Sequence, residues 1–297
     1  MSAVSAVVVN WNGGTELIEC IKALLSQEGV ELEVVVVDNG STDGSADLVE
    51  VRFPQVKVVR NGRNLGYAKA ANIGVGATRG EHVLLLNPDT RLLPEALPLL
   101  ISFMESHPDA GALGPKLINP NGSLQPSCRR FPPLGATFLR HTPLELLFPS
   151  HPFLKRYLMF DLDRTRPAEV DWVSGACILL RREAFEEVGG FDERYFLYSE
   201  DVDLCLRLKK AGWKVYYVPH AKAFHIGGHA SERRPVFSLY HAHRSMWLFF
   251  RAHHRKSALW WLGPFVLVGI LGRFLVVLLT LAVRRLLRRR GRDAMAP

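Results

Sequence analysis

Cysteines are scarce in this sequence, and they show no paired spacing. The four are Cys20, Cys128, Cys177 and Cys205, spread over 297 residues. This spacing indicates neither a zinc knuckle nor a disulfide framework, so we expect a reducing, cytoplasmic setting. The chain also lacks a charged start, because it runs almost at once into an apolar stretch. We therefore expect no cleavable signal and an amino terminus that stays inside the cell.

Two nucleotide-binding motifs are absent as well. Neither G-x-G-x-x-G nor G-x-x-x-x-G-K-S/T occurs, which disfavours a dinucleotide-binding or P-loop enzyme. Aromatic and basic residues are not interleaved as in RNA-binding proteins, and six of the arginines behind the net charge of +8 crowd into residues 284–292. We therefore expect no nucleic-acid partner.

Apolar strands alternate with helical segments through the first hundred residues. Strand patterns occupy residues 3–10, 32–40, 56–61 and 81–90, and helical patterns occupy residues 15–27, 41–53, 66–78 and 93–107. Continuous apolar strands that alternate with helices predict an α/β fold, in which helices cover both faces of a mostly parallel sheet.

The second half of the chain begins less regularly. Residues 126–167 carry seven prolines and no steady period, so we interpret them as a long excursion that covers a substrate or a partner. Order returns with a strand and a helix within residues 170–191, a helix within 195–213 and a strand within 214–228.

Polar residues end three of the predicted strands. The clusters are Asn10–Asn12, Asp38–Ser41 and Asn87–Asp89. Open α/β sheets bind ligands just beyond the carboxyl ends of their strands, so we expect the three clusters to meet at one site.

Asp89 and Asp38 each allow two interpretations. An aspartate after a strand is most often a helix cap or a turn residue, and capping accounts for residues 41–43. At the ligand edge of a sheet, however, Asp89 can hold a divalent cation against a diphosphate, since Pro88 fixes the backbone before it. Asp38 directly ends an apolar strand, where its carboxylate can accept hydrogen bonds from a base or a ribose.

A third acidic group begins a predicted helix. The acids are Glu200, Asp201 and Asp203. Acidic side chains near a helix amino terminus stabilise the helix dipole, but three acids in four positions are more than capping requires. One of them can act as a general base toward a hydroxyl. His225 follows a strand and precedes two glycines, a position that suits a metal ligand.

Six motifs follow one another over residues 3–230. They are VVVNWNG, VVVVDNGSTDGS, NGRNLGYAKAANIG, LLLNPDT, the long VSGACILL…KKAGW segment and AFHIGG. Their order and spacing resemble glycosyltransferase family 2, especially its rhamnosyltransferase-like members. The resemblance implies a GT-A fold with a Rossmann-like sheet, and inverting transfer of a sugar from a nucleotide diphosphate with Mg²⁺ or Mn²⁺ as cofactor.

The resemblance also implies roles for individual residues. Asp201 looks like the catalytic base, with Glu200 as the second candidate, while Asp89 and His225 look like metal ligands. Gly175 and Ala176 look like the segment beside the donor sugar and the acceptor. Asn87 departs from the first aspartate of the family's D-x-D motif, which leaves Asp89 as the one charged residue of that motif. The residues expected to bind the nucleotide sugar are Trp11, Asp38, Asn64, Asn72 and Asn87.

The carboxy-terminal segment differs in character from the rest. Residues 258–283 are apolar except for Arg273, and the arginine-rich tail of residues 284–292 follows. A run of this length can span a bilayer, lie in the interface as shorter helices, or pack as a core helix on the body of a soluble protein. We expect membrane association through residues 258–292 at the cytoplasmic face of the cell membrane. The division is thus a GT-A domain over residues 1–235 and a membrane-associating segment over 236–297.

The expected activity is transfer of a sugar to a hydroxyl of a lipid-linked or cell-surface glycan. A dTDP-rhamnose donor is favoured by the subgroup that the sequence resembles, and UDP-sugars come next. The alternatives are a nucleotidyltransferase and a non-catalytic glycan-binding or scaffold protein on the same fold. The acids at 38, 89 and 201 weigh against the scaffold. The oligomeric state stays open.

Overall fold

The computed structural model describes residues 3–131, 151–227 and 234–293, and only the backbone of residues 284–293. Part of the proline-rich excursion, residues 132–150, and Gly228 of the AFHIGG motif therefore lie outside the described residues, as do the side chains of the arginine-rich tail.

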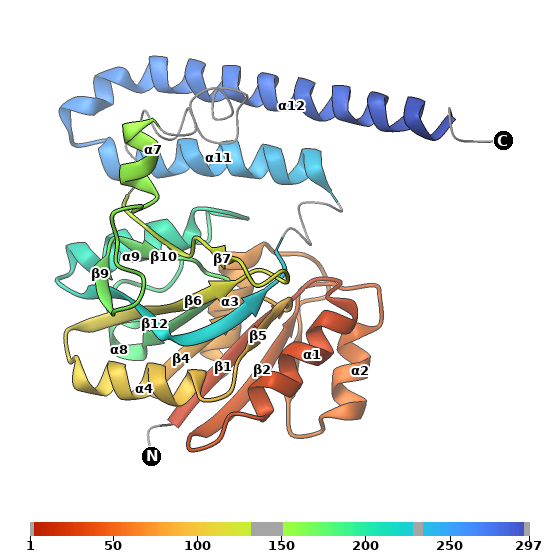
Figure 1. Cartoon of the computed structure of the whole chain (residues 1–297), viewed down its shortest axis with the longest axis vertical. Coiled ribbons are helices and arrows are strands. Elements are labelled where there is room, and N and C mark those ends of the chain that lie inside the picture. The colour runs from red at the N-terminus through yellow and green to blue at the C-terminus, as the bar shows by residue number, and fades with distance from the viewer. Residues whose placement is uncertain (1–2, 132–150, 228–233, 294–297) are drawn as a thin grey trace.

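A mixed sheet forms the centre of the molecule, with helices on both faces (Figure 1). Its strand order is β3-β2-β1-β4-β11-β6-β12-β5. The first four strands in this order run parallel to one another, β11 runs antiparallel to both neighbours, and β12 runs parallel to β6. The strands of this path are β1 Ala3–Asn10, β2 Glu31–Asp38, β3 Lys57–Arg60, β4 His82–Leu86, β5 Thr90–Leu92, β6 Ala110–Ile118, β11 Cys177–Arg181 and β12 Lys214–His225.

Shorter strands complete the sheet structure. β7 (Leu124–Gln125) pairs with β6, and β9 (Ala168–Val170) pairs with β12. β8 (Cys128–Arg129) and β10 (Trp172–Val173) form a separate two-stranded sheet. The predicted α/β architecture is confirmed.

Alternating residues of the central strands build two cores. Val4, Ala6 and Val8 of β1 face one layer, and Val7 and Val9 face the other. The first layer contains α1 (Gly14–Leu25), α2 (Ser45–Arg52) and α4 (Ala96–Ser106), and the second contains α3 (Tyr67–Gly76), α8 (Arg182–Glu187) and α9 (Glu200–Lys210). The short α7 (Pro152–Tyr157) lies beside the second layer.

The predicted strand over residues 81–90 is wrong in its second half. β4 ends at Leu86, a turn covers Pro88 and Asp89, and Thr90 begins β5. β5 pairs with β12 at the far edge of the sheet. Proline cannot donate to a central ladder, so the chain leaves the sheet there and returns on the other side of β12.

Two helices form a hairpin above this body. α11 (Pro235–His254) leads through the 3₁₀ turn η1 (Ala258–Leu262) into α12 (Gly263–Asp293). α12 begins next to Pro264, which its first turn accommodates, and it continues without interruption through Gly272. In Figure 1, α11 lies between the body and α12.

Gly74 marks the closest approach of α3 to the sheet. A Cβ built there would lie 2.3 Å from Val7 Cγ1 and 2.8 Å from Val37 Cγ2, whereas one at Gly76 would meet nothing within 4 Å. Gly74→Ala should thus cost about 1–3 kcal/mol of stability through overpacking. Gly76→Ala, the matched control, should be neutral or slightly stabilising. Thermal unfolding of the two variants checks this, and equal melting temperatures would contradict the packing.

Candidate active site

The ends of β1 and β2 meet through a buried amide and carboxylate. Asn10 and Asp38 are register partners, and Asn10 Nδ2 lies 3.3 Å from Asp38 Oδ1 and 3.1 Å from Ser41 Oγ. The backbone N–H of Ser41 also donates to Asp38 Oδ1, at 3.3 Å. Two of the predicted polar clusters therefore come together, and Asp38 stays buried, with one carboxylate oxygen tied to this network.

The loop that follows β3 is fastened to the end of β2. Asn39 Nδ2 donates to Asn64 Oδ1 at 3.1 Å and to the Gly66 carbonyl at 3.2 Å, and Asn39 Oδ1 accepts from the Leu65 N–H at 2.9 Å. Gly40 has a positive φ, and a Cβ there would lie 2.7 Å from the Arg63 backbone. The structure thus brings Asn64 beside the Asp38 cluster, held by contacts that only a glycine at position 40 permits.

Two predicted nucleotide-binding residues have strong contacts within the protein. The Arg234 guanidinium lies over the Trp11 ring, 5.3 Å from its centroid, within cation–π range. Asn72 exchanges two hydrogen bonds of 2.9 Å with the Phe191 peptide, one through each end of its amide. These bonds fix the turn after α8, so Asn72 has a clear structural role. Its contact with a nucleotide stays a prediction.

Asp89 and His225 lie together, as the sequence predicted for two metal ligands. Asp89 Oδ1 is 3.4 Å from His225 Nε2, and Asp89 Oδ2 accepts from the Gly227 N–H at 3.0 Å. Burial alone would raise the pKa of the Asp89 carboxyl, but the His225 imidazole and the Gly227 N–H outweigh it and hold that pKa below its ordinary value. Asp89 is therefore ionised at neutral pH.

The far side of His225 is held by Gln125, a residue that sequence reasoning missed. Gln125 Oε1 lies 2.6 Å from His225 Nδ1, and Gln125 Nε2 donates to Asn119 Oδ1 at 2.9 Å. An amide oxygen only accepts, so His225 carries a proton on Nδ1. The other ring nitrogen, Nε2, faces the Asp89 carboxylate, and the two can share a proton or hold a cation between them.

A nitrogen lone pair and a carboxylate oxygen repel each other unless a proton or a cation lies between them. The donor set of Asp89 and His225 therefore fits a divalent cation, with Gln125 as the orienting partner of the imidazole. Mg²⁺ and Mn²⁺ sites of this kind take one or two protein ligands and further oxygens from substrate phosphates. Within the described part of the chain, no group of three or more histidines, cysteines and acids lies together.

Residues Gly175 and Ala176 connect the Asn87 turn with the acidic helix. The Ala176 carbonyl accepts from the Asn87 N–H at 3.1 Å and from Thr90 Oγ1 at 3.0 Å. The Gly175 N–H donates to Asp201 Oδ2 at 3.0 Å. The antiparallel β11, whose Cys177 pairs with Leu86, brings this segment to the ends of the parallel strands.

The two acids at the start of α9 differ in exposure. Asp201 is half-buried, and its carboxylate accepts from the N–H groups of Gly175 and Val202. Glu200 is buried, and its Oε2 has no hydrogen-bond partner within the described residues. Burial, followed by repulsion from Asp201, raises the pKa of Glu200 to about 8. Burial also raises the pKa of Asp201, against the opposing effect of its two N–H donors.

Tyr67 is a further residue at this site, and no motif in the sequence marks it. Its hydroxyl donates to the Gly175 carbonyl at 3.2 Å, and its backbone N–H donates to the Phe196 carbonyl. Burial and the nearby charges of Glu200 and Asp201 raise the pKa of its phenol, so Tyr67 stays a neutral donor. Its position at the first turn of α3 looked like ordinary helix sequence.

Asp203, the third acid of this group, binds α11 and not the segment that Asp201 contacts. Asp203 Oδ1 lies 2.6 Å from His253 Nε2, and Asp203 Oδ2 accepts from Arg207 Nε at 2.7 Å. One of the three acids noted in the sequence is thus a structural carboxylate. It is buried and binds a histidine 50 positions away in the sequence.

α11 also holds the turn that precedes the acids. Tyr198 and Ser199 both have positive φ, at 68° and 66°, an unfavourable conformation for residues with a Cβ. Ser245 Oγ of α11 donates to the Leu197 carbonyl at 3.0 Å, and His241 stacks on Phe196. The placement of a boundary at residue 235 stays a prediction, although α11 contacts the loop before the acids through these side chains.

Comparison with known proteins identifies the family. Residues 5–189 match the family model described as glycosyl transferase family 2, and residues 165–230 match one described as an N-terminal domain of galactosyltransferase. This chain belongs to glycosyl transferase family 2. It is an enzyme that transfers sugars, and the sequence-based resemblance is confirmed.

Named relatives of this family 2 glycosyltransferase act in rhamnose transfer. It is 37% identical over 271 residues to the N-acetylglucosaminyl-diphospho-decaprenol L-rhamnosyltransferase of Mycobacterium tuberculosis, a match that covers 87% of this chain and 86% of that protein. It is 33% identical over 167 residues to a rhamnosyltransferase of Escherichia coli, covering 53% of this chain and 56% of that one.

The fold of this family 2 glycosyltransferase also matches a solved structure. The mannosyltransferase PcManGT from Pyrobaculum calidifontis, solved with GDP-Man and Mn²⁺, aligns with a TM-score of 0.61 at 18% identity, covering 99% of this chain and 81% of that one. The GT-A fold is thereby confirmed.

Glu200 makes stability depend on pH. Its pKa in the folded protein, about 8, lies above the value of about 4.3 for an unfolded glutamate. Between these values the folded state holds more protons than the unfolded state, so raising the pH through this window lowers stability.

Glu200→Gln removes this titration. We expect the variant to gain stability over the parent as the pH rises from 5 to 8, by on the order of 1–3 kcal/mol. Chemical unfolding of both proteins at the two pH values measures the effect. A constant difference between them would contradict a raised Glu200 pKa.

His253→Ala should weaken the active site from a distance. Loss of the hydrogen bond to a buried carboxylate costs about 1–3 kcal/mol, and the Asp203 side of α9 then loses its tie to α11. We expect a lower melting temperature and a lower kcat. His220→Ala, on an exposed position of β12, is the control and should change neither. Parent-like kcat and melting temperature in His253→Ala would rule out this coupling.

Proposed function

We propose that this family 2 glycosyltransferase catalyses inverting transfer of a sugar from a nucleotide diphosphate to a hydroxyl of a lipid-linked or cell-surface glycan. The observation that carries the proposal is the Gly175 N–H bond to Asp201, 3.0 Å long, which fixes a half-buried carboxylate beside the segment that joins β10 to β11. The neighbouring Ala176 is tied to the Asn87 turn, so donor-side and acceptor-side residues share one short segment.

Asp201 is the base in this proposal. It accepts the proton of the acceptor hydroxyl while that oxygen forms a bond to the anomeric carbon and the bond from that carbon to the diphosphate breaks. Attack from the face opposite the leaving group inverts the configuration. Glu200 is the less suitable base, because it is more buried and its pKa of about 8 keeps it mostly protonated at neutral pH.

Asp89 and His225 would hold a divalent cation, which would neutralise charge on the departing diphosphate. The geometry in support is the Asp89–His225 pair, oriented by Gln125. Mn²⁺ in the Pyrobaculum relative supports the same class of ion. Asn87, two residues before Asp89, is uncharged, so the protein offers one carboxylate here and the donor's phosphates would supply further oxygens.

The donor and the acceptor follow from the relatives. Two are named as rhamnosyltransferases, so we favour a rhamnose nucleotide such as dTDP-rhamnose, with UDP-sugars next. The mycobacterial relative acts on a diphospho-decaprenol acceptor. A lipid-linked acceptor agrees with the one apolar helix in the described residues that is long enough to cross a membrane, and we place the enzyme at the cytoplasmic face.

Asp201→Asn should lower kcat by about 10²–10⁴-fold and leave donor binding unchanged, because a general base contributes that much to proton transfer. Glu200→Gln is the matched control, since it changes the adjacent carboxyl and should retain most of the turnover. Transfer from a panel of nucleotide sugars to a lipid-linked acceptor, with calorimetric donor binding, measures both. Near-normal transfer by Asp201→Asn would refute its role and leave the scaffold alternative to be examined.

Metal removal should abolish transfer, and Mn²⁺ or Mg²⁺ should restore it. Asp89→Asn should raise the Mn²⁺ concentration needed for half-maximal activity by at least tenfold, because it removes the one carboxylate of the pair. Gln125→Ala should raise it less, since the imidazole loses only its orienting partner. Full activity in excess chelator would overturn the metal-dependent mechanism.

A further inference from the structure

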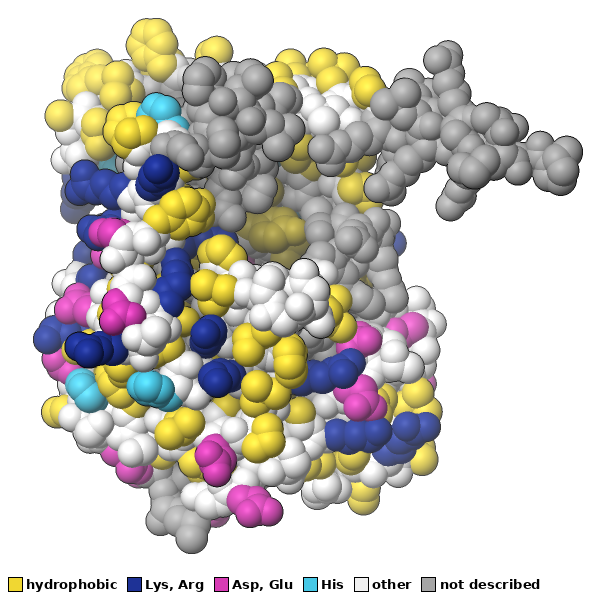
Figure 2. All heavy atoms as spheres, viewed as in Figure 1, with side chains coloured by type: hydrophobic (Ala, Val, Ile, Leu, Met, Phe, Trp, Pro, Cys, Tyr) yellow, Lys and Arg dark blue, Asp and Glu magenta, His cyan; other side chains and the backbone are white. Residues whose placement is uncertain are grey.

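The outward face of α12 is a continuous apolar surface. Five of its apolar side chains are more than half exposed. They are Trp261 of η1 (84%) and, in α12, Phe265 (76%), Val268 (69%), Leu275 (57%) and Leu279 (65%). Their spacing of three, four and seven residues places them on one side of a helix. Apolar side chains gather over this hairpin in Figure 2, while charged ones lie on the body below.

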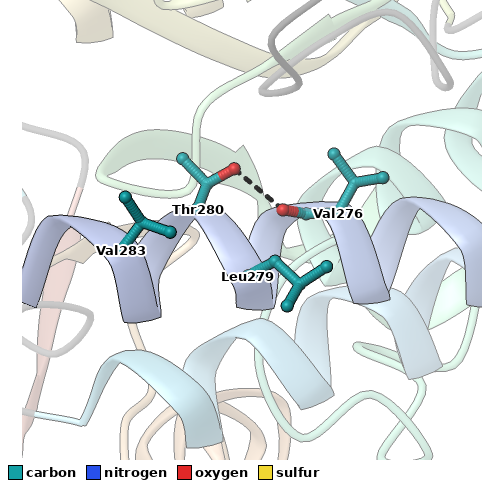
Figure 3. Close-up of a pocket in the computed structure, with 4 residues that line it drawn as sticks. All are labelled: Val276, Leu279, Thr280 and Val283. Atoms are coloured by element: carbon teal, nitrogen blue, oxygen red, sulfur yellow. Dashed lines mark hydrogen bonds between the residues drawn. The ribbon is translucent and has the colours of Figure 1, made fainter. Parts of the chain in front are cut away.

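Polar groups on this surface are satisfied internally. The Thr280 hydroxyl donates to the Val276 carbonyl at 2.8 Å, as Figure 3 shows. It lies with Val276, Leu279 and Val283 around a hollow of about 480 Å³. A hydroxyl bonded to the preceding turn of its own helix can enter an apolar medium without losing a partner.

The inward face of α12 is fastened to α11. Val266 and Ile270 pack on Phe250, and Arg273 Nη1 lies 2.8 Å from His243 Nε2. Burial, and to a smaller extent the charge of Arg273, lowers the pKa of His243 to about 4. The neutral His243 ring therefore accepts this hydrogen bond. The single charge that interrupts residues 258–283 is thus turned toward α11 and away from the apolar face.

α11 in turn is fastened to the catalytic body. His253 binds Asp203, Ser245 binds the Leu197 carbonyl, and Arg244 Nη1 donates to the Arg194 carbonyl at 2.8 Å. α12 is long enough to cross the roughly 30 Å of hydrocarbon in a bilayer. To do so it must either leave α11, which strips Arg273 of its partner, or draw α11 and its arginines into the lipid.

We propose that α12 does not cross the membrane, and that η1 and α12 lie flat in one bilayer leaflet with α11 as the spacer that carries the catalytic body. This inference rests on the proposed function and adds the orientation in which the site meets a lipid-linked acceptor. The occupant of the apolar face is an anionic lipid surface. Trp260 and Trp261 lie at the start of the face, and six arginines follow at 284–292.

The flat arrangement fixes the side of the body that faces the lipid. α11 contacts both the body and α12, and it also holds the turn before Glu200 and Asp201. The acids therefore lie at a set height above the leaflet, separated from it by the hairpin. A lipid-linked hydroxyl can then reach them while its lipid stays in the bilayer.

The test measures the depth of four side chains in the full chain. The described native cysteines are all buried, so single variants Phe265→Cys, Val268→Cys, Leu275→Cys and Leu279→Cys can each carry one spin label. Val51→Cys, on an exposed position of α2, is the aqueous control. The labelled proteins are bound to vesicles of phosphatidylcholine and phosphatidylglycerol, and depth is read from collisions with oxygen and with a water-soluble nickel complex.

A flat helix predicts the same shallow depth for all four labels, whereas a spanning helix predicts a range of about 21 Å between positions 265 and 279. A graded depth would overturn the proposal. Absence of vesicle binding, or a stable dimer in buffer that covers the same face, would overturn it too. Transfer to a lipid-linked acceptor is assayed on the same vesicles. Uniform depth without transfer would contradict the proposed function, whereas transfer with graded depth would contradict the flat arrangement.

Discussion

The antiparallel insertion of β11 between β4 and β6 is the constraint on which the active site depends. Parallel strands alone would bring Asn10, Asp38 and Asn87 to one edge of the sheet, but the segment before β11 would not lie there. Because β11 runs the other way, its amino-terminal end meets the carboxyl ends of its neighbours. Gly175 and Ala176 therefore reach the Asn87 turn and Asp201 together.

Contacts from two helices explain why the site tolerates unfavourable local structure. Tyr198 and Ser199 adopt left-handed backbone conformations, and Glu200 is buried with one oxygen unpaired among the described residues. Each of these features costs free energy. Contacts from α3, through Tyr67, and from α11, through Ser245, hold the segment in place. The helical hairpin thus supports the candidate site in addition to carrying the proposed membrane surface.

One helix, α11, connects the acidic helix α9 with the apolar helix α12. The buried Asp203 carboxylate binds His253 on α11, and His243 on the same helix binds Arg273 of α12. α11 therefore carries contacts to both α9 and α12. In the proposed flat arrangement, this helix sets the orientation of the candidate site relative to the lipid surface.

The sequence by itself determined the α/β class, the position of Asp38 at the end of a strand, and the apolar nature of residues 258–283, because these depend on local periodicity and residue type. It also indicated the family, through motifs in a fixed order. Only the tertiary structure decided that the strand ends at Leu86 and that the chain resumes in β5, because pairing with β12 involves residues more than 130 positions away. Likewise, Asp203 and Asp201 look alike in sequence. Helical geometry turns one toward His253 and the other toward Gly175, and that choice depends on which elements pack around α9.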